Sequence, residues 1–81
     1  MNKRYYAATL IGDEPKTIYK VFAFRYPSQR NQWVKEKGIY PRVSISSKIA
    51  KKHFCYEVEF QNVNRKWDWV YEGIRSYWLA I

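Results

Sequence analysis

The sequence has few of the residues on which disulfide scaffolds and metal sites depend. Among its 81 residues there is one cysteine, Cys55, and one histidine, His53. A single cysteine excludes an intramolecular disulfide, and with it the small secreted proteins that disulfides hold together. The two residues also supply at most two of the four ligands that a tetrahedral zinc site requires. We therefore expect neither a disulfide framework nor a metal site.

Glycine clusters and long apolar runs are also missing. The three glycines, Gly12, Gly38 and Gly73, are isolated, so there is no glycine-rich loop to hold a phosphate. A chain of this length has a small core, and a cavity of roughly 300 Å³ for a cofactor or a small-molecule substrate would be costly in it. The apolar runs are too short for a signal peptide or a membrane span. We expect a cytoplasmic protein that uses no membrane, cofactor or small-molecule substrate.

Two residue pairs are candidates for catalytic groups. Cys55 with His53 as its base would need a third, orienting group, and a structural role at the end of a helix is the better interpretation. Glu57 and Glu59 share one strand face, but a glycosidase needs a larger groove than this chain can frame. We predict no catalytic residue and no enzymatic activity.

The first half of the chain predicts two strands and two helices. Residues 5–11 and 17–25 favour strands, joined by a turn at 12–16. In the second of these strands Lys20, Phe22 and Phe24 fall on one face, with Tyr19, Val21 and Ala23 on the other. A helix should open at Pro27–Ser28, with Ser28 as its N-cap and Gly38 just past its end. Residues 42–46 form a brief extended piece, after which Ser46 or Ser47 caps a second, amphipathic helix.

The second half predicts another pair of strands. Tyr56, Val58 and Phe60 alternate with acids, and after a polar turn at 61–64 the residues from Trp67 to Glu72 alternate again. Gly73 is a candidate bulge, and we favour a strand over a helix for residues 74–81. The expected fold is a single α+β domain over residues 1–81. Its antiparallel sheet has about four strands, with two short helices on one face, in the order strand-strand-helix-helix-strand-strand.

Positive charge is concentrated in the middle of the chain. Seven basic residues lie between Arg30 and Lys52 against one acid, Glu36, a net of +6 out of the formal +8. Such a localised field predicts an anionic partner: DNA, RNA, a nucleoprotein or an acidic host protein. Lysines and arginines would neutralise phosphates while an exposed tyrosine stacks on a base. The predicted contact residues are Arg30, Lys35, Lys37, Tyr40, Arg42, Lys48, Lys51 and Lys52.

Aromatic residues dominate the C-terminal third, where the charge is slightly negative. Core packing accounts for most of them, but any that are exposed suggest a protein contact, since Trp and Tyr dominate interface hot spots. An edge strand there would also allow a homodimer. The candidate protein-contact residues are Trp67, Trp69, Tyr71 and Trp78.

The segment from Phe24 to Val34, which reads FRYPSQRNQWV, resembles a pattern in short uncharacterised proteins of bacteriophages and conjugative elements. Arg42 and the Ile49–Lys52 helix are similar to the element that follows in them, and the resemblance covers Arg4 to Phe54. It implies a mobile genetic element in a bacterial host cell. Such proteins are often inhibitors of host defence, including anti-CRISPR proteins. Two hypotheses result: a binding protein for nucleic acid or nucleoprotein that uses the basic segment, or a protein-directed inhibitor anchored by its aromatic residues.

Overall fold

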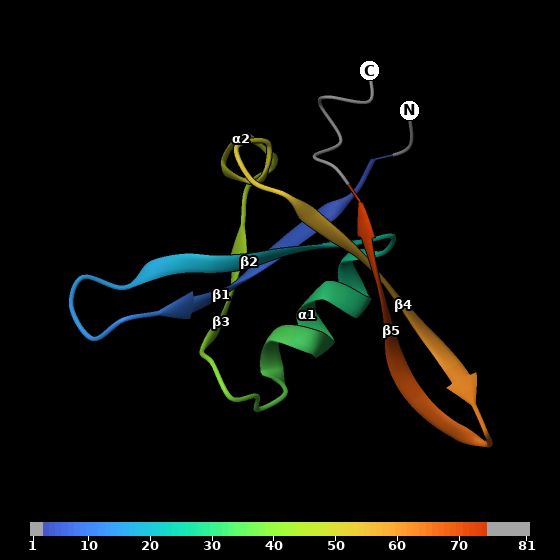
Figure 1. Ribbon diagram of the computed structural model, residues 1–81. Coiled ribbons are helices and arrows are strands. Elements are labelled where there is room, and N and C mark those ends of the chain that lie inside the picture. Colours follow the sequence, from blue (N-terminus) through green and yellow to red (C-terminus); the bar gives the residue numbers. More distant parts are fainter. Residues whose placement is uncertain (1–2, 75–81) are drawn as a thin grey trace.

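A computed structural model describes residues 3–74 of the chain (Figure 1). Five strands form one sheet in the order β3-β1-β2-β4-β5. Neighbouring strands are antiparallel, except that β2 and β4 are parallel. The elements are β1 (Tyr5–Ile11), β2 (Thr17–Phe24), α1 (Pro27–Lys35), β3 (Arg42–Ile45), α2 (Ser47–Ala50), β4 (Cys55–Val63) and β5 (Lys66–Ile74).

The expected sheet of about four antiparallel strands is therefore wrong, and a mixed five-stranded sheet takes its place. The extended piece after Pro41 is a full strand, β3, which pairs with β1 and brings Tyr6 opposite Ile45. The chain from β2 to β4 passes through both helices and β3, which is long enough for the crossover that parallel strands require. Alternation along a strand shows which residues share a face, but it does not name the neighbouring strand.

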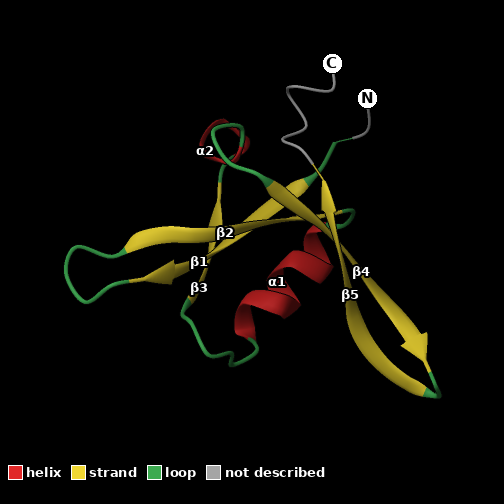
Figure 2. Ribbon diagram, viewed as in Figure 1, coloured by secondary structure: helices red, strands yellow, loops and turns green. Residues whose placement is uncertain are grey.

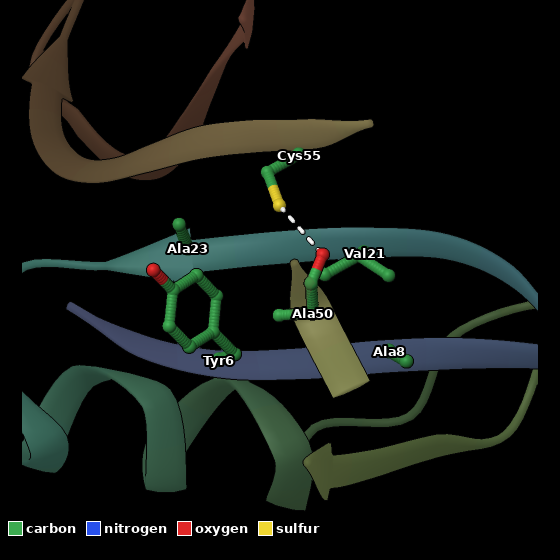
Figure 3. Packing of buried hydrophobic residues seen from close by; sticks show 6 residues of the cluster. All are labelled: Tyr6, Ala8, Val21, Ala23, Ala50 and Cys55. Atoms are coloured by element: carbon green, nitrogen blue, oxygen red, sulfur yellow. Dashed lines mark hydrogen bonds between the residues drawn. The ribbon is translucent and has the colours of Figure 1, made fainter. Parts of the chain in front are cut away.

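The two helices lie on opposite faces of the sheet, so their expected placement on one face is also wrong (Figure 2). On the face that we call the α2 face, Ala50 of α2 packs with Val21 and Cys55 (Figure 3). On the other, the α1 face, Trp33 of α1 packs with Phe22 and Phe24. Each face therefore has its own small apolar cluster.

Helix α1 starts at Pro27, with Tyr26 as its N-cap in an extended conformation and no side-chain cap bond. Ser28 is thus inside the first turn, and its predicted role as N-cap is wrong. Proline is suited to the first helical position because its missing N–H would have no helical acceptor there. The helix ends at Lys35, with Glu36 rather than a glycine motif at its C-cap.

Helix α2 is a single turn. Of the two predicted caps, Ser46 or Ser47, it is Ser46 that caps the helix, since its side chain accepts a hydrogen bond from the Ile49 amide. The sequence spacing predicted an apolar face of Ile49, Ala50, His53 and Phe54, but only Ala50 is buried, and Ile49 and Phe54 are exposed. The short helix serves to turn the chain from β3 into β4.

The hairpin β4–β5 is longer than the sequence pattern predicted. Its strands pair without a break from Cys55 opposite Ile74 to Val63 opposite Lys66, so residues 61–63 are strand and the predicted bulge at Gly73 is absent. The turn consists of Asn64 and Arg65, both with positive φ, as in the tight turns whose twist matches the strands. The prediction for residues 74–81 falls, apart from Ile74, outside the described residues. Within residues 3–74, no helix has the length and apolar character to cross a membrane.

Candidate functional site

A bulge in β2 directs two side chains to one face of the sheet. Thr9 pairs with Lys20 and Leu10 pairs with Ile18, which leaves Tyr19 without an opposing residue. An extra residue of this kind bends the strand and redirects its side chains, and bulges are often found next to functional sites. Tyr19, expected on the opposite face from Lys20, instead lines the same hollow on the α1 face. The Lys20 ammonium lies 5.2 Å from the centroid of the Tyr19 ring.

The opposite wall of this hollow is built by the C-terminal end of α1 and the start of β3. The guanidinium of Arg42 lies 4.1 Å above the ring centroid of Trp33 and donates from Nη1 to the Trp33 carbonyl oxygen at 2.9 Å. Its Nη1 is also 4.0 Å from Oε1 of Glu36. Through this hydrogen bond Arg42 fixes the end of α1 against β3.

Gly38 leaves room for Arg42 to pass directly over it. A Cβ at position 38 would lie 2.7 Å from Nη2 and 2.9 Å from Nε of Arg42. A side chain there would require the guanidinium of Arg42 to shift. The expected role of Gly38 as a helix C-terminal residue is therefore replaced by a steric one.

Between these walls lies a cleft of about 340 Å³, which we call the aromatic cleft. Phe22 and Trp33 form its floor, and Tyr19 and Tyr40 lie 5.2 Å apart, centroid to centroid. A smaller hollow of about 280 Å³, lined by Lys20, Phe22, Tyr56 and Tyr71, adjoins it. The aromatic cleft is lined by Thr9, Tyr19, Lys20, Phe22, Trp33, Gly38, Ile39, Tyr40, Arg42 and Tyr71.

The rim of the aromatic cleft is formed by the loop between α1 and β3. Another hollow, of about 390 Å³, adds Lys35 and Lys37 to the loop residues that it shares with the cleft. Both lysines are exposed. Ile39, which precedes Tyr40 in the same loop, is 94% exposed. The aromatic cleft thus combines flat aromatic surfaces with Lys20, and two exposed lysines line the neighbouring hollow that shares its loop.

The structure divides the predicted basic segment into two groups. The first group lies near the aromatic cleft, next to the N-terminal end of β3, and consists of Lys35, Lys37, Tyr40 and Arg42. Lys48, Lys51 and Lys52 are exposed in and after α2, at the other end of β3 and on the other face of the sheet (Figure 1). Arg30 is half-buried on α1 and donates to the Asn31 side chain at 2.8 Å. One continuous basic surface over all eight predicted residues is therefore not formed.

Some aromatic residues of the β4–β5 hairpin pack against α1, whereas others are exposed. Nε1 of Trp69 donates to Oε1 of Glu36 at 2.8 Å, and Nε1 of Trp33 donates to the Tyr71 hydroxyl at 2.9 Å, so the hairpin is fastened to α1. Trp67, in contrast, is 66% exposed and stacks on Phe60 at 5.3 Å between ring centroids. Trp78 lies outside the described residues.

The surroundings of Cys55 and Glu57, two of the residues considered for catalysis, favour structural roles. Cys55 is buried, its thiol 3.7 Å from the Ala50 carbonyl oxygen (Figure 3), and burial raises its pKa to about 11. At neutral pH the thiol is protonated, which opposes a nucleophilic role. Glu57 accepts an ion-paired hydrogen bond from Nε of Arg4 at 2.9 Å. Among residues 3–74 no group of three or more His, Cys, Asp or Glu side chains is arranged to hold a metal ion.

Of the residues that line the aromatic cleft, the sequence analysis selected Tyr40, Arg42 and Tyr71 as contact residues and missed Tyr19, Lys20 and Phe22, among others. The available signal was Lys20, a lysine on a strand face that otherwise carries Phe22 and Phe24. A charged residue in that position marks the point where the face opens to solvent.

Comparison with protein-family models, with curated proteins and with solved structures finds no match to this chain, so the geometry of the site is the basis for its proposed function.

Proposed function

We propose that this chain is a non-enzymatic binding protein that engages nucleic acid, alone or within a nucleoprotein, through the aromatic cleft and the lysines beside it. The observation that carries the proposal is the exposed Tyr19–Tyr40 pair beside Lys20, with Lys35 and Lys37 in the adjacent hollow of the same loop. Aromatic faces and cations side by side match the alternation of bases and phosphates along a single strand.

Each group has a separate task in this proposal. Tyr40 stacks on an unpaired base, an interaction worth about 1–3 kcal/mol per base in proteins that bind single strands. Lys35 and Lys37 neutralise phosphates as point charges on flexible stems. Arg42 adds positive potential, but because its guanidinium is held by Trp33 it shapes the cleft instead of contacting the ligand.

The division of the basic segment provides a matched experiment. Lys35→Gln/Lys37→Gln removes two charges at the cleft, and Lys51→Gln/Lys52→Gln removes two on the opposite face. Binding of a labelled single strand is measured for both variants over a salt series. We expect the first variant to reduce the log–log salt slope by about 1.4, at roughly 0.7 for each phosphate of a single strand that is no longer neutralised. The second should leave the slope near that of the wild type, and equal reductions in the two variants would refute the assignment to the cleft.

A second comparison tests stacking separately from charge. Tyr40→Leu keeps an apolar side chain but removes the ring, and should weaken binding about tenfold, the equivalent of 1.4 kcal/mol. Tyr40→Phe keeps the ring and should bind like the wild type. If both variants bind normally, Tyr40 does not stack on a base.

The origin in a mobile genetic element, proposed from the resemblance of residues 24–34, is compatible with this activity. The second hypothesis, a protein-directed inhibitor of host defence, is favoured by one observation, the exposed Phe60–Trp67 stack. It predicts that Trp67→Ala abolishes capture of a host protein while Lys35→Gln/Lys37→Gln only slows association. Since Trp69 and Tyr71 are engaged with α1, fewer aromatic anchors are free than the sequence suggested, and we place nucleic acid first.

A further inference from the structure

Strand β5 ends the sheet, and among residues 3–74 no strand pairs with its outer edge. A two-residue turn is closed by a hydrogen-bonded pair, here Val63 and Lys66, so the alternate residues from Lys66 onward bond to β4. The N–H and C=O groups of Trp67, Trp69 and Tyr71 then point outward. Consistent with this, the Trp69 amide donates to the Asp68 carboxylate at 2.8 Å instead of to a strand.

We propose that β5 pairs antiparallel with β5 of a second copy of this chain, around a two-fold axis at Trp69. The two five-stranded sheets would then join into one. The choice of a second copy rests on self-complementarity: in this register Lys66 of each copy lies opposite Glu72 of the other, which gives two oppositely charged pairs per dimer.

Glu72, the acidic partner in the proposed Lys66–Glu72 pair, has an unfavourable position within the monomer. Glu72 lies directly opposite Glu57 on β4, and like charges in that position destabilise a hairpin. Glu57 has a counter-charge, because Nε of Arg4 lies 2.9 Å from its Oε1. Among residues 3–74, Glu72 has no ion pair, so a lysine from a second copy supplies a counter-charge at this point.

The aromatic residues favour the same register. Trp67 of one copy falls opposite Tyr71 of the other, on the α1 face, at a separation where aromatic cross-strand pairs interact. Their exposed fractions are 66% and 45%, so pairing would cover apolar surface that the monomer leaves in water. A long exposed edge strand without a partner is otherwise an aggregation hazard.

Other two-fold registers are worse. Centring on Asp68 places the two Asp68 carboxylates opposite each other, and centring on Val70 places each Asp68 opposite Glu72. Centring on Trp67 pairs only residues 66–68 of the strand. Centring on Tyr71 pairs residues 68–74, as many as the register at Trp69, and opposes no acids, but it places no lysine opposite an acid. The register at Trp69 is favoured because it pairs seven residues and also sets Lys66 opposite Glu72.

The dimer has a consequence for the aromatic cleft. A two-fold axis perpendicular to the sheet keeps both α1 faces on the same side, so two clefts would be presented to one ligand. A strand long enough to reach both would bind with increased avidity. This consequence depends on the proposed function, but the dimer itself does not.

The test is sedimentation equilibrium without nucleic acid, at about 0.15 M salt, where the Debye length near 8 Å screens the repulsion between two basic chains. Lys66→Glu and Glu72→Lys should each raise the dimer dissociation constant about tenfold, because both symmetric pairs become repulsive. The double variant Lys66→Glu/Glu72→Lys restores opposite charges and should return the constant to that of the wild type. Lys16→Glu and Glu14→Lys, in the distant β1–β2 turn, carry the same charge changes and serve as controls.

Recovery in the double variant, with circular dichroism showing all variants folded, would support the pairing and its register. A wild-type chain that stays monomeric at several hundred micromolar would overturn it, and so would a dimer whose constant moves no more with position 66 or 72 than with the controls. Loss of nucleic-acid binding in the cleft variants leaves this measurement unaffected, so the two proposals fail independently.

Discussion

The hydrogen bond between Trp33 and Tyr71 fastens the β4–β5 hairpin to α1, and replacing Tyr71 with phenylalanine tests its contribution. Trp33 is 1% exposed, and its Nε1 donates to the Tyr71 hydroxyl at 2.9 Å. Tyr71→Phe keeps the ring and removes only the acceptor. The indole N–H is then left buried without a partner, a state that costs about 1–3 kcal/mol.

This cost is large for a chain of this length. At roughly 0.05–0.15 kcal/mol per residue, the whole free energy of unfolding is about 4–12 kcal/mol. A loss of 1 kcal/mol lowers the melting temperature of a domain of this size by about 4–8 °C. We therefore expect Tyr71→Phe to melt at least about 4 °C below the wild type in thermal unfolding followed by far-UV circular dichroism, at a concentration where the chain is monomeric.

The control is Tyr19→Phe. Tyr19 and Tyr71 are 46% and 45% exposed, but the Tyr19 hydroxyl makes no hydrogen bond to a side chain or backbone group among the described residues. Its removal should change the unfolding free energy by less than about 0.5 kcal/mol. In a Trp33→Phe background, where the donor is gone, Tyr71→Phe should also cost little. Equal stabilities for Tyr71→Phe and Tyr19→Phe would refute the assigned role of this hydrogen bond.

Three further predictions concern single positions. Gly38→Ala should lose about 1–3 kcal/mol of stability in urea unfolding by displacing Arg42 from the Trp33 carbonyl, and the same change should be nearly neutral in an Arg42→Ala background. Because burial raises the pKa of Cys55 to about 11, the unfolded chain loses that thiol proton first; between pH 9 and 11 stability should fall by up to about 1.4 kcal/mol per pH unit, and Cys55→Ala should flatten the profile there. Arg65→Gly should raise the melting temperature, because the φ of 63° at this turn position costs a side-chain-bearing residue about 1 kcal/mol; an unchanged or lower value would contradict this.

Local patterns in the sequence predicted much of the secondary structure. Alternation correctly assigned Phe22 and Phe24 to one face of β2 and Val21 and Ala23 to the other. The prediction of a serine cap at Ser46 or Ser47 was correct, with Ser46 as the cap, because a serine side chain satisfies free amides where a helix begins. The same rule wrongly predicted Ser28 as an N-cap, because Pro27 before it occupies the first helical position.

The sheet and the candidate site depend on contacts that such patterns do not contain. Nothing in the periodicity of β2 or β4 shows that Val21 pairs with Cys55 in parallel, because that pairing depends on the crossover between them. The bulge at Tyr19 arises from a mismatch between two strands, so it cannot be inferred from either strand alone. Charge along the chain likewise grouped Lys37 with Lys51, which the fold places on opposite sides of the sheet.

We propose that nucleic acid binds in the aromatic cleft and not on the basic surface of α2. A titration of the isotopically labelled protein with a short single-stranded oligonucleotide, followed through backbone amide chemical shifts in NMR, distinguishes the two sites. We predict that shifts concentrate at residues 19–22 and 35–42 and spare residues 48–52. Shifts confined to residues 48–52, or no shifts at saturating oligonucleotide, would contradict the account.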